Sequence, residues 1–280
     1  MFNRSGISSD CKTKEKVPET LARLIILCLV MWTAQPLMAA EPLGRLAGLY
    51  EATTIITGET NLSERERGIR ECFELVLSKV SGRQKVMALP TLQSARETAS
   101  DYVDHFTYLD RKKGIQISDE QGTRDRSFLF TVTFRQSDID GLLAKEGLSP
   151  WLAERPAIAI ELIINDGMEI YRLTQTSERG WGQRAVIESL EGRTAVSLLL
   201  PTNKEAALDA NAVKLTGRMD VTKEGYWSSS WALSRNGEPV PLLDGKETGA
   251  TDWNVDIGTF DKVLADAVWT SVETLSALPD

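Results

Sequence analysis

"SPWLAERPAIAIELII", residues 149–164, lies near the middle of the 280-residue chain and decides the fold. It places a Trp, an Arg and two prolines before an apolar run, 157–164, in which Glu161 is the one polar residue. Proline fixes φ and has no N–H to donate, so residues 149–156 are unsuited to the interior of a helix or strand. The apolar run that follows predicts a buried strand. Because the pattern of strands and helices restarts there, we interpret 149–156 as a linker between two domains.

The first half begins with the pattern of a strand followed by a helix. Residues 49–56 alternate and are rich in Tyr, Thr and Ile, which predicts a strand. Ser63 and Glu66 form a capping box at the start of a helix that Gly82 ends in a left-handed turn. Apolar residues at spacings of three and four give this helix one buried face: Ile69, Cys72, Phe73, Val76, Leu77 and Val80.

The rest of the first half predicts a second helix, a strand and a short third helix. The second helix begins after Pro90 and includes Phe106, and His105 near its end is expected to be a packed or capping residue. Residues 126–134 alternate and predict a strand with one strongly buried face. The short helix covers 137–145 and ends at Gly147.

The second half predicts two helices and a small sheet. The expected elements, in chain order, are a strand at 157–164, a helix at 183–191, a strand at 195–200, a hairpin of 212–221 with 226–234, a turn at 236–237 that leads to an edge segment broken by Pro239 and Pro241, and a helix at 259–275. Gly180 and Gly182 mark the start of the first of these helices, with Trp181 packing nearby. Gly225 supplies the residue that a bulged hairpin turn needs.

These patterns predict an α+β protein of two small mixed α/β domains, each a small sheet packed by helices. The N-terminal domain covers 41–148, the linker 149–156 and the C-terminal domain 157–280. Residues 1–40 have the charged lead, the apolar middle at 24–32 and the small-residue end of a signal peptide, so we expect a periplasmic protein. The alternative is an uncleaved inner-membrane anchor at 24–40, the one case in which we expect membrane contact.

The charge and cysteine content narrow the choice of partner. The chain has a formal net charge of −8. Residues 1–40 hold more basic than acidic side chains, so cleavage would leave an even more acidic protein. This argues against nucleic acid and against anionic lipid as partners. Cys72 would be the one cysteine left after cleavage, and its place on a buried helix face protects it.

The sequence offers few of the residues that enzymes use. With one histidine in the chain, a site with several imidazole ligands is excluded, and a Ser-His-Asp triad would have to use His105. "SERGWGQRA", residues 177–185, lacks the third Gly and the Lys of a phosphate-binding loop. We therefore expect no metal, no nucleotide and no cofactor. Carboxylate pairs at helical spacing are the remaining candidates for catalysis: Glu71 with Glu74, and Asp101 with Asp104.

"YWSSSWAL", residues 226–233, has the most unusual composition in the chain. Aromatic rings alternating with serines can form a platform for carbohydrate or peptide. We favour the other interpretation, in which Trp227 and Trp231 fill the core beneath the last helix, because their face of the strand continues with Leu233. We name no catalytic residue, and the candidate binding residues are Trp151, Arg155, Trp227 and Trp231.

Several segments of the first half resemble an exported proteobacterial family, domain of unknown function 2066 (DUF2066). They are "LYEATTIITGE" (49–59), "LSKVSG" (77–82), "YVDHFTY" (102–108) and "FTVTF" (130–134), followed by Trp151, Arg155 and Pro156. The gap after Trp151 is longer than the family's. This resemblance implies no activity. Residues 207–240 are more loosely similar to the TolB amino-terminal domain and to activators of peptidoglycan synthases, which bind other proteins.

The small number of candidate catalytic residues favours a binding protein over an enzyme. We expect an exported cell-envelope binding or accessory protein that contacts an envelope protein. The alternative is a carboxylate-dependent hydrolase or a binder of envelope glycan. We also predict that Trp151 is largely buried at the junction of the two halves, where Arg155 hydrogen-bonds main-chain carbonyls.

Overall fold

A computed structural model describes residues 48–114, 126–152, 155–206, 212–242 and 252–278, with the backbone alone for 252–257. The expected signal peptide at 1–40 and the alternative anchor at 24–40 lie outside these ranges. Within them, no helix has both the length and the hydropathy to cross a membrane.

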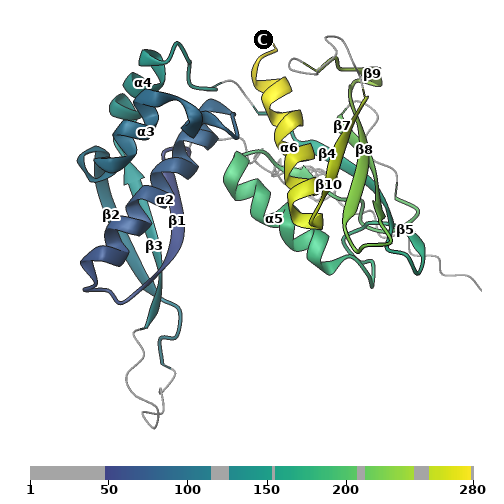
Figure 1. Ribbon diagram of the computed structural model, residues 1–280, viewed down its shortest axis with the longest axis horizontal. Helices are drawn as coiled ribbons and strands as arrows, with labels where there is room; N and C mark the ends of the chain where they lie inside the picture. The colour runs from purple at the N-terminus through teal and green to yellow at the C-terminus, as the bar shows by residue number, and fades with distance from the viewer. Residues whose placement is uncertain (1–47, 115–125, 153–154, 207–211, 243–251, 279–280) are drawn as a thin grey trace, which may run out of the picture. The chain divides into compact units, whose positions relative to one another are not determined.

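The first sheet is a three-stranded antiparallel sheet in the order β1-β3-β2, and helix α2 packs on one of its faces (Figure 1). The bounds are β1 (Glu51–Thr57), α2 (Leu62–Ser81), β2 (Val103–Asp110) and β3 (Ser127–Phe134). Shorter helices follow α2 and β3: η1 (Val86–Ala88), α3 (Pro90–Glu97), η2 (Ala99–Tyr102) and α4 (Gln136–Lys145).

Helix α2 has the predicted buried stripe and the predicted left-handed end at Gly82, with φ 67°. The predicted capping box is wrong, because Asn61 caps the helix. Its Oδ1 accepts hydrogen bonds from Glu64 N at 3.3 Å and from Ser63 Oγ at 2.8 Å. The helix lies close to the sheet at Gly68, where an added Cβ would come within 2.8 Å of side-chain carbons of Ile56 and Phe130.

The predicted long second helix is also wrong. Helix α3 ends at Glu97, and residues from Val103 onward form strand β2 at the edge of the sheet. Two β2 aromatics pack on rings of β3, with the Tyr108 and Phe130 centroids 5.0 Å apart and those of Phe106 and Phe130 5.4 Å apart. This packing outweighs the helical spacing of the sequence, because β-strand formation depends on what the neighbouring strand offers.

The second sheet has the strand order β10-β8-β7-β4-β5, with β6 paired to β4 and β9 paired to β8. The bounds are β4 (Ile158–Asn165), β5 (Ile170–Arg172), α5 (Trp181–Thr194), β6 (Leu198–Leu199), β7 (Val213–Val221), β8 (Trp227–Arg235), β9 (Glu238–Pro239), β10 (Asp252–Gly258) and α6 (Phe260–Ser276). The predicted hairpin of β7 with β8 is confirmed, whereas β5 and β10 were not predicted. The predicted strand at 195–200 is reduced to β6, because Ala195 takes a left-handed conformation at the end of α5.

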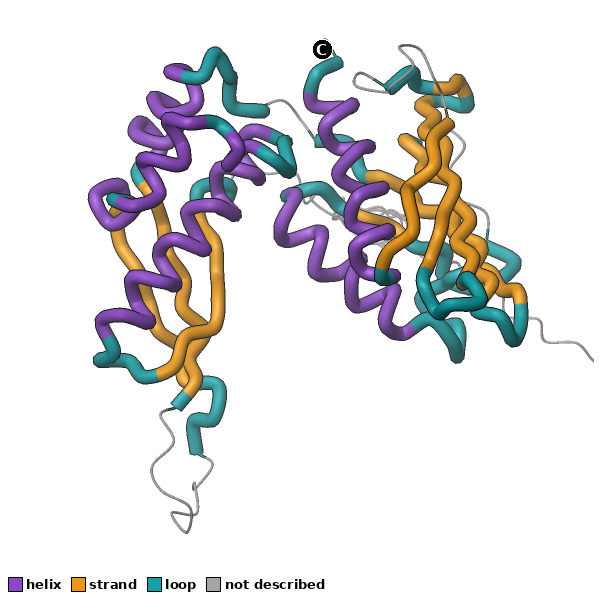
Figure 2. Tube along the Cα trace, in the orientation of Figure 1, coloured by secondary structure: helices purple, strands orange, loops and turns teal. Residues whose placement is uncertain are grey.

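Helices α5 and α6 cover the same face of the second sheet (Figures 1 and 2). Strands β4 and β7 are parallel, so α5 lies in the crossover connection that joins them. Gly217 on β7 makes room for the ring of Trp231, since a Cβ there would lie 2.1 Å from Trp231 Cε3. Each sheet has its own apolar core, which confirms the α+β class. The domain boundaries at 148 and 157 stay a prediction.

Candidate functional site

Trp151 and Arg155 form a buried cluster that we call the latch, and their side chains are 8% and 6% exposed. The Arg155 guanidinium carbon lies 4.3 Å from the centroid of the Trp151 ring. Its nitrogens donate to Lys79 O at 2.8 Å, Trp151 O at 2.9 Å and Thr194 O at 2.6 Å. Arg155 therefore closes the last turns of two helices, α2 and α5. The predicted burial of Trp151 and the predicted bonds to carbonyls are confirmed.

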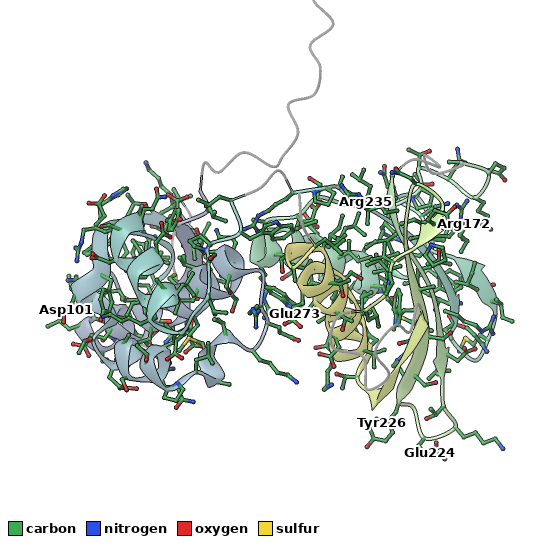
Figure 3. All side chains as sticks on the ribbon, turned by 90° about the horizontal axis from the view of Figure 1, so that it is seen from above. Asp101, Arg172, Glu224, Tyr226, Arg235 and Glu273 are labelled. Atoms are coloured by element: carbon green, nitrogen blue, oxygen red, sulfur yellow. The ribbon has the colours of Figure 1, made fainter. Side chains whose placement is uncertain are left out.

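Helix α2 supplies further contacts around the latch. Trp151 N donates to Val80 O at 2.8 Å. At Gly82, a Cβ would come within 2.8 Å of Ser276 Cβ and 3.1 Å of Trp151 Cε3, so only glycine allows this approach. Beyond it, Gln84 N donates to Glu273 Oε1 on α6 at 2.8 Å, and Figure 3 labels Glu273.

Two cations lie buried near this end of α2. Burial lowers the pKa of Arg155 to about 10, so its guanidinium stays charged at neutral pH. Burial lowers the pKa of Lys79 to about 8. The Lys79 ammonium donates to Gly48 O at 2.7 Å and to Glu51 O. Both cations donate their hydrogen bonds to main-chain carbonyls of this chain. The latch therefore offers a partner almost no surface.

The two tryptophans of β8 are placed as the core interpretation expects. Trp231 is 2% exposed, and its Nε1 donates to Ser229 Oγ at 2.5 Å. Trp227 is half-buried against the same core. A flat carbohydrate platform would need both rings at the surface, and of the two residues only Trp227 is partly exposed.

The predicted carboxylate pairs do not converge on a shared cleft. Glu71 accepts hydrogen bonds from Thr54 Oγ1 at 2.7 Å and from the Arg67 guanidinium, whereas Glu74 forms an ion pair with Arg96. The second pair, Asp101 with Asp104, loses its helical spacing because one residue lies in η2 and the other on β2.

His105 is exposed on β2, so its predicted packed or capping role is wrong. Its Nδ1 lies 2.9 Å from Asp104 Oδ2, and its Nε2 lies 3.3 Å from Thr133 Oγ1. This order of carboxylate, imidazole and hydroxyl resembles a catalytic triad. However, Thr133 Oγ1 donates to Glu51 Oε2 at 3.2 Å, and the row of side chains runs across the neighbouring strands β2, β3 and β1. We interpret it as a cross-strand polar network.

An open groove of about 530 Å³ runs between α5 and α6, and we call it the α5–α6 groove. Trp181 and Phe260, the first residues of the two helices, lie at one end. Small and aliphatic side chains line its length: Gly182, Ala185, Val186 and Ser189 from α5, and Ala265 from α6. Arg193 and Gln84 also line it. The two helices start at the same end, since a Cβ at Gly182 would lie 3.1 Å from Phe260 Cζ.

Trp181 is 76% exposed, so its predicted packing is wrong. Gly180 starts the helix as predicted, with φ 78°. A Cβ at Gly180 would lie 2.5 Å from Leu173 Cδ1, so the chain turns tightly over the core at that point. Trp181 follows this turn and points into solvent. The alternation of Gly, Trp and Gly was the sequence signal that could have drawn attention to it.

The acidic residues of the groove lack the properties of a glycosidase pair. The carboxylate of Asp266 forms an ion pair with Lys262 and accepts from Gln84 Nε2 at 3.4 Å. A hydrogen bond from Thr259 lowers the pKa of Asp261. A general acid for glycoside hydrolysis needs a raised pKa, so Asp261 is unsuited to that role.

A second groove of about 520 Å³ lies beside β5 and is polar. Arg179, which lines it, is held by Asp166, with Nε 2.7 Å from Oδ2, and by Glu169 at 3.4 Å. Arg184 donates to Ser177 O and to Arg179 O, both at 2.9 Å. These arginines stabilise the loop and leave little capacity for a ligand. Among the described residues, no group of three or more His, Cys, Asp or Glu is arranged to hold a metal ion.

Comparisons with known proteins gave one finding. The model of a family described as "Domain of unknown function (DUF8605)" matches residues 45–152. No curated protein and no solved structure matches significantly. The first half is thus similar to a family of unknown function, as expected, but under another name than DUF2066. The match ends before the residues that were compared with the TolB amino-terminal domain.

Proposed function

We propose that the protein is an exported accessory protein of the cell envelope that binds another protein through the α5–α6 groove. The observation that carries this proposal is the exposure of Trp181, at 76%, on an open groove that Phe260 also lines. Exposed tryptophan is costly in water, and Trp is among the residues that contribute most to protein interfaces. Arg193, in the same groove, belongs to another of these residue types.

The placement in the envelope rests on the signal-like residues 1–40, with an inner-membrane anchor at 24–40 as its alternative. The accessory role agrees with the looser similarity of residues 207–240 to envelope domains that bind proteins. We propose this similarity, and the resemblance of the first half to DUF2066, together with the function.

The latch supports this function indirectly. Trp151 and Arg155 were candidate binding residues, yet their polar groups and rings contact the chain itself. Their role in the proposal is to hold the C-terminal ends of α2 and α5 together, which steadies one wall of the groove. Of the four candidate residues, Trp227 keeps surface for a secondary contact.

Crosslinking in intact cells tests the function. The tagged protein is crosslinked, purified and analysed by mass spectrometry beside two variants, Trp181→Ala and Tyr226→Ala. Tyr226 is also an exposed aromatic residue, at the tip of the β7–β8 hairpin and outside the groove (Figure 3). We expect one reproducible envelope protein that Trp181→Ala loses and Tyr226→Ala keeps.

Two results would contradict the proposal. If no protein is enriched over an untagged strain, the accessory function is wrong. If glycan fragments are recovered without a protein, the glycan-binding alternative takes its place.

A further inference from the structure

We infer that the α5–α6 groove receives an amphipathic α-helix of the partner, about three turns long, which places a large apolar side chain beside Trp181 and a carboxylate beside Arg193. This inference rests on the proposed function and specifies the occupant of the same groove.

The walls of the groove favour a helix over an extended segment. Both walls are helices, and the main-chain groups of a helix interior are bonded within the helix. An extended peptide between them would find no main-chain partners for its own N–H and C=O groups, and each unpaired buried group is costly. A helix satisfies its own main chain and presents only side chains.

The dimensions of the groove suit a helix of three turns. Trp181 and Arg193 both line it. They are twelve positions apart on α5, which is about 18 Å at about 1.5 Å per residue. The residues between them include Gly182, Ala185 and Ser189, and Ala265 faces them from α6. Small side chains on both walls allow a third helix to approach within the usual interaxial distance of about 8–10 Å.

The charges of the groove define the polar end of the partner helix. Arg193 is exposed, and its guanidinium has no hydrogen bond or ion pair among the described residues. Asp266, a carboxylate that also lines the groove, already pairs with Lys262. A carboxylate on the partner would therefore meet a cation that the described part of this chain leaves available. The overall charge of −8 makes such a local positive site more selective, because it disfavours acidic helices elsewhere on the surface.

Site-specific photocrosslinking tests the inference. The probe, p-benzoylphenylalanine, replaces Ser189 inside the groove or Glu188, which is exposed on the same helix but does not line the groove. The crosslinked peptide of the partner is then sequenced by mass spectrometry. We expect the Ser189 position to crosslink at least about tenfold more than the Glu188 position, and to one segment with an apolar face and an acidic residue about eleven positions away along it.

A synthetic peptide of that segment gives the second measurement. We expect its circular dichroism to become helical on binding and the fluorescence of Trp181 to change. Trp181→Ala should weaken binding about 30-fold, and Arg193→Glu about 10-fold or more. Exchange of the acidic residue of the peptide for Lys should restore binding to the Arg193→Glu variant. Arg235→Glu, the same charge change on β8 outside the groove, should leave binding unchanged.

The outcomes separate this inference from the proposed function. If a protein partner is captured at the Ser189 position but binds in an extended form or ignores the charge exchange, the helix is wrong and the function stands. If the partner crosslinks equally at Ser189 and Glu188, it does not occupy the groove, and both the helix and binding through the groove are wrong. A crosslink to a second copy of this chain, or to glycan, would also contradict the inference that a helix of another protein occupies the groove. If no partner is captured at all, both fail.

Discussion

The latch and the α5–α6 groove use the same two residue types with opposite results. In the latch, the Trp151 ring and the Arg155 guanidinium stack at 4.3 Å, and three main-chain carbonyls accept from the arginine. In the groove, Trp181 is exposed and Arg193 has no partner among the described residues. A tryptophan and an arginine near each other in sequence therefore do not identify a binding site. What distinguishes the two pairs is whether the chain already satisfies their contacts.

The difference also concerns where each pair lies in its local structure. Arg155 is four residues after Trp151 and reaches the last turns of two helices, where carbonyls have no partner within the helix. Trp181 is the first residue of α5, and most of its side chain faces solvent rather than the core. Helix ends thus determine both results. The C-terminal ends attract the arginine of the latch, and an N-terminal end displays the tryptophan of the groove.

The largest expected difference in stability is between the alanine variants of the two tryptophans. Trp151→Ala should lower the free energy of unfolding by about 3–5 kcal/mol, because it opens a cavity in the core and uncovers the Arg155 guanidinium. Trp181→Ala should change it by less than about 0.5 kcal/mol, as is usual for exposed positions. Urea unfolding followed by circular dichroism measures both. Equal effects would remove the distinction between latch and groove.

The two arginines should differ almost as much. Arg155→Met keeps much of the side-chain volume but leaves the carbonyls of Lys79, Trp151 and Thr194 without their donor. We expect a loss of about 2–4 kcal/mol. Arg193→Met is the matched control, with an expected change of less than about 0.5 kcal/mol. If thermal unfolding shows Arg155→Met to be as stable as the control, the buried hydrogen bonds contribute nothing net.

Lys79, which lies near the latch, should make the free energy of unfolding depend on pH. Its folded pKa of about 8 lies below the ordinary 10.5, so the folded state binds fewer protons than the unfolded state between these values. The contribution of Lys79 to stability therefore rises as pH increases through this window, by at most about 3 kcal/mol. The stability of the unmodified protein relative to a Lys79→Met variant should grow between about pH 7.5 and 10.

Cys72 acts in the opposite direction and must be removed first. Burial raises the pKa of its thiol to about 12 from 9, so its contribution to stability falls as pH rises above 9. The Lys79 comparison is therefore made by urea unfolding in a Cys72→Ala background. If the stability difference between this background and its Lys79→Met variant stays constant with pH, the ammonium is not desolvated as the fold implies.

The smallest expected effect on stability comes from a glycine of α5 that lies outside the groove. Gly192 lies on α5 with no atom within 4 Å of an added Cβ, so Gly192→Ala should stabilise the protein by about 0.5–1 kcal/mol. Partner binding should be unchanged, since Gly192 does not line the groove. Gly217→Ala is the contrasting variant, because its Cβ would overlap the Trp231 ring, and we expect it to destabilise by about 1–3 kcal/mol. Thermal unfolding distinguishes the two signs.

Much of the local structure followed from the sequence alone. Helix α2, strand β3 and the β7–β8 hairpin were predicted because each has a clear apolar period and a glycine or polar residue at its end. The burial of Trp151 was predicted from its place in the proline-containing joint between the two halves, and the core position of Trp231 from Leu233 on the same face of the strand. The class of the fold, α+β, is the sum of these local patterns.

The tertiary structure alone decided the remaining features. Strand β2 was predicted as helix, because its residues have helical spacing and only the rings of β3 make it a strand. The exposure of Trp181 depends on the tight turn at Gly180, which packs against Leu173. Leu173 precedes helix α5, so the apolar spacing of that helix does not reveal this contact. Sequence alone does not distinguish the guanidinium of Arg193, unpartnered among the described residues, from the satisfied one of Arg155. Their difference lies in which main-chain carbonyls come within hydrogen-bonding distance, and that is set when helices from distant parts of the chain pack together.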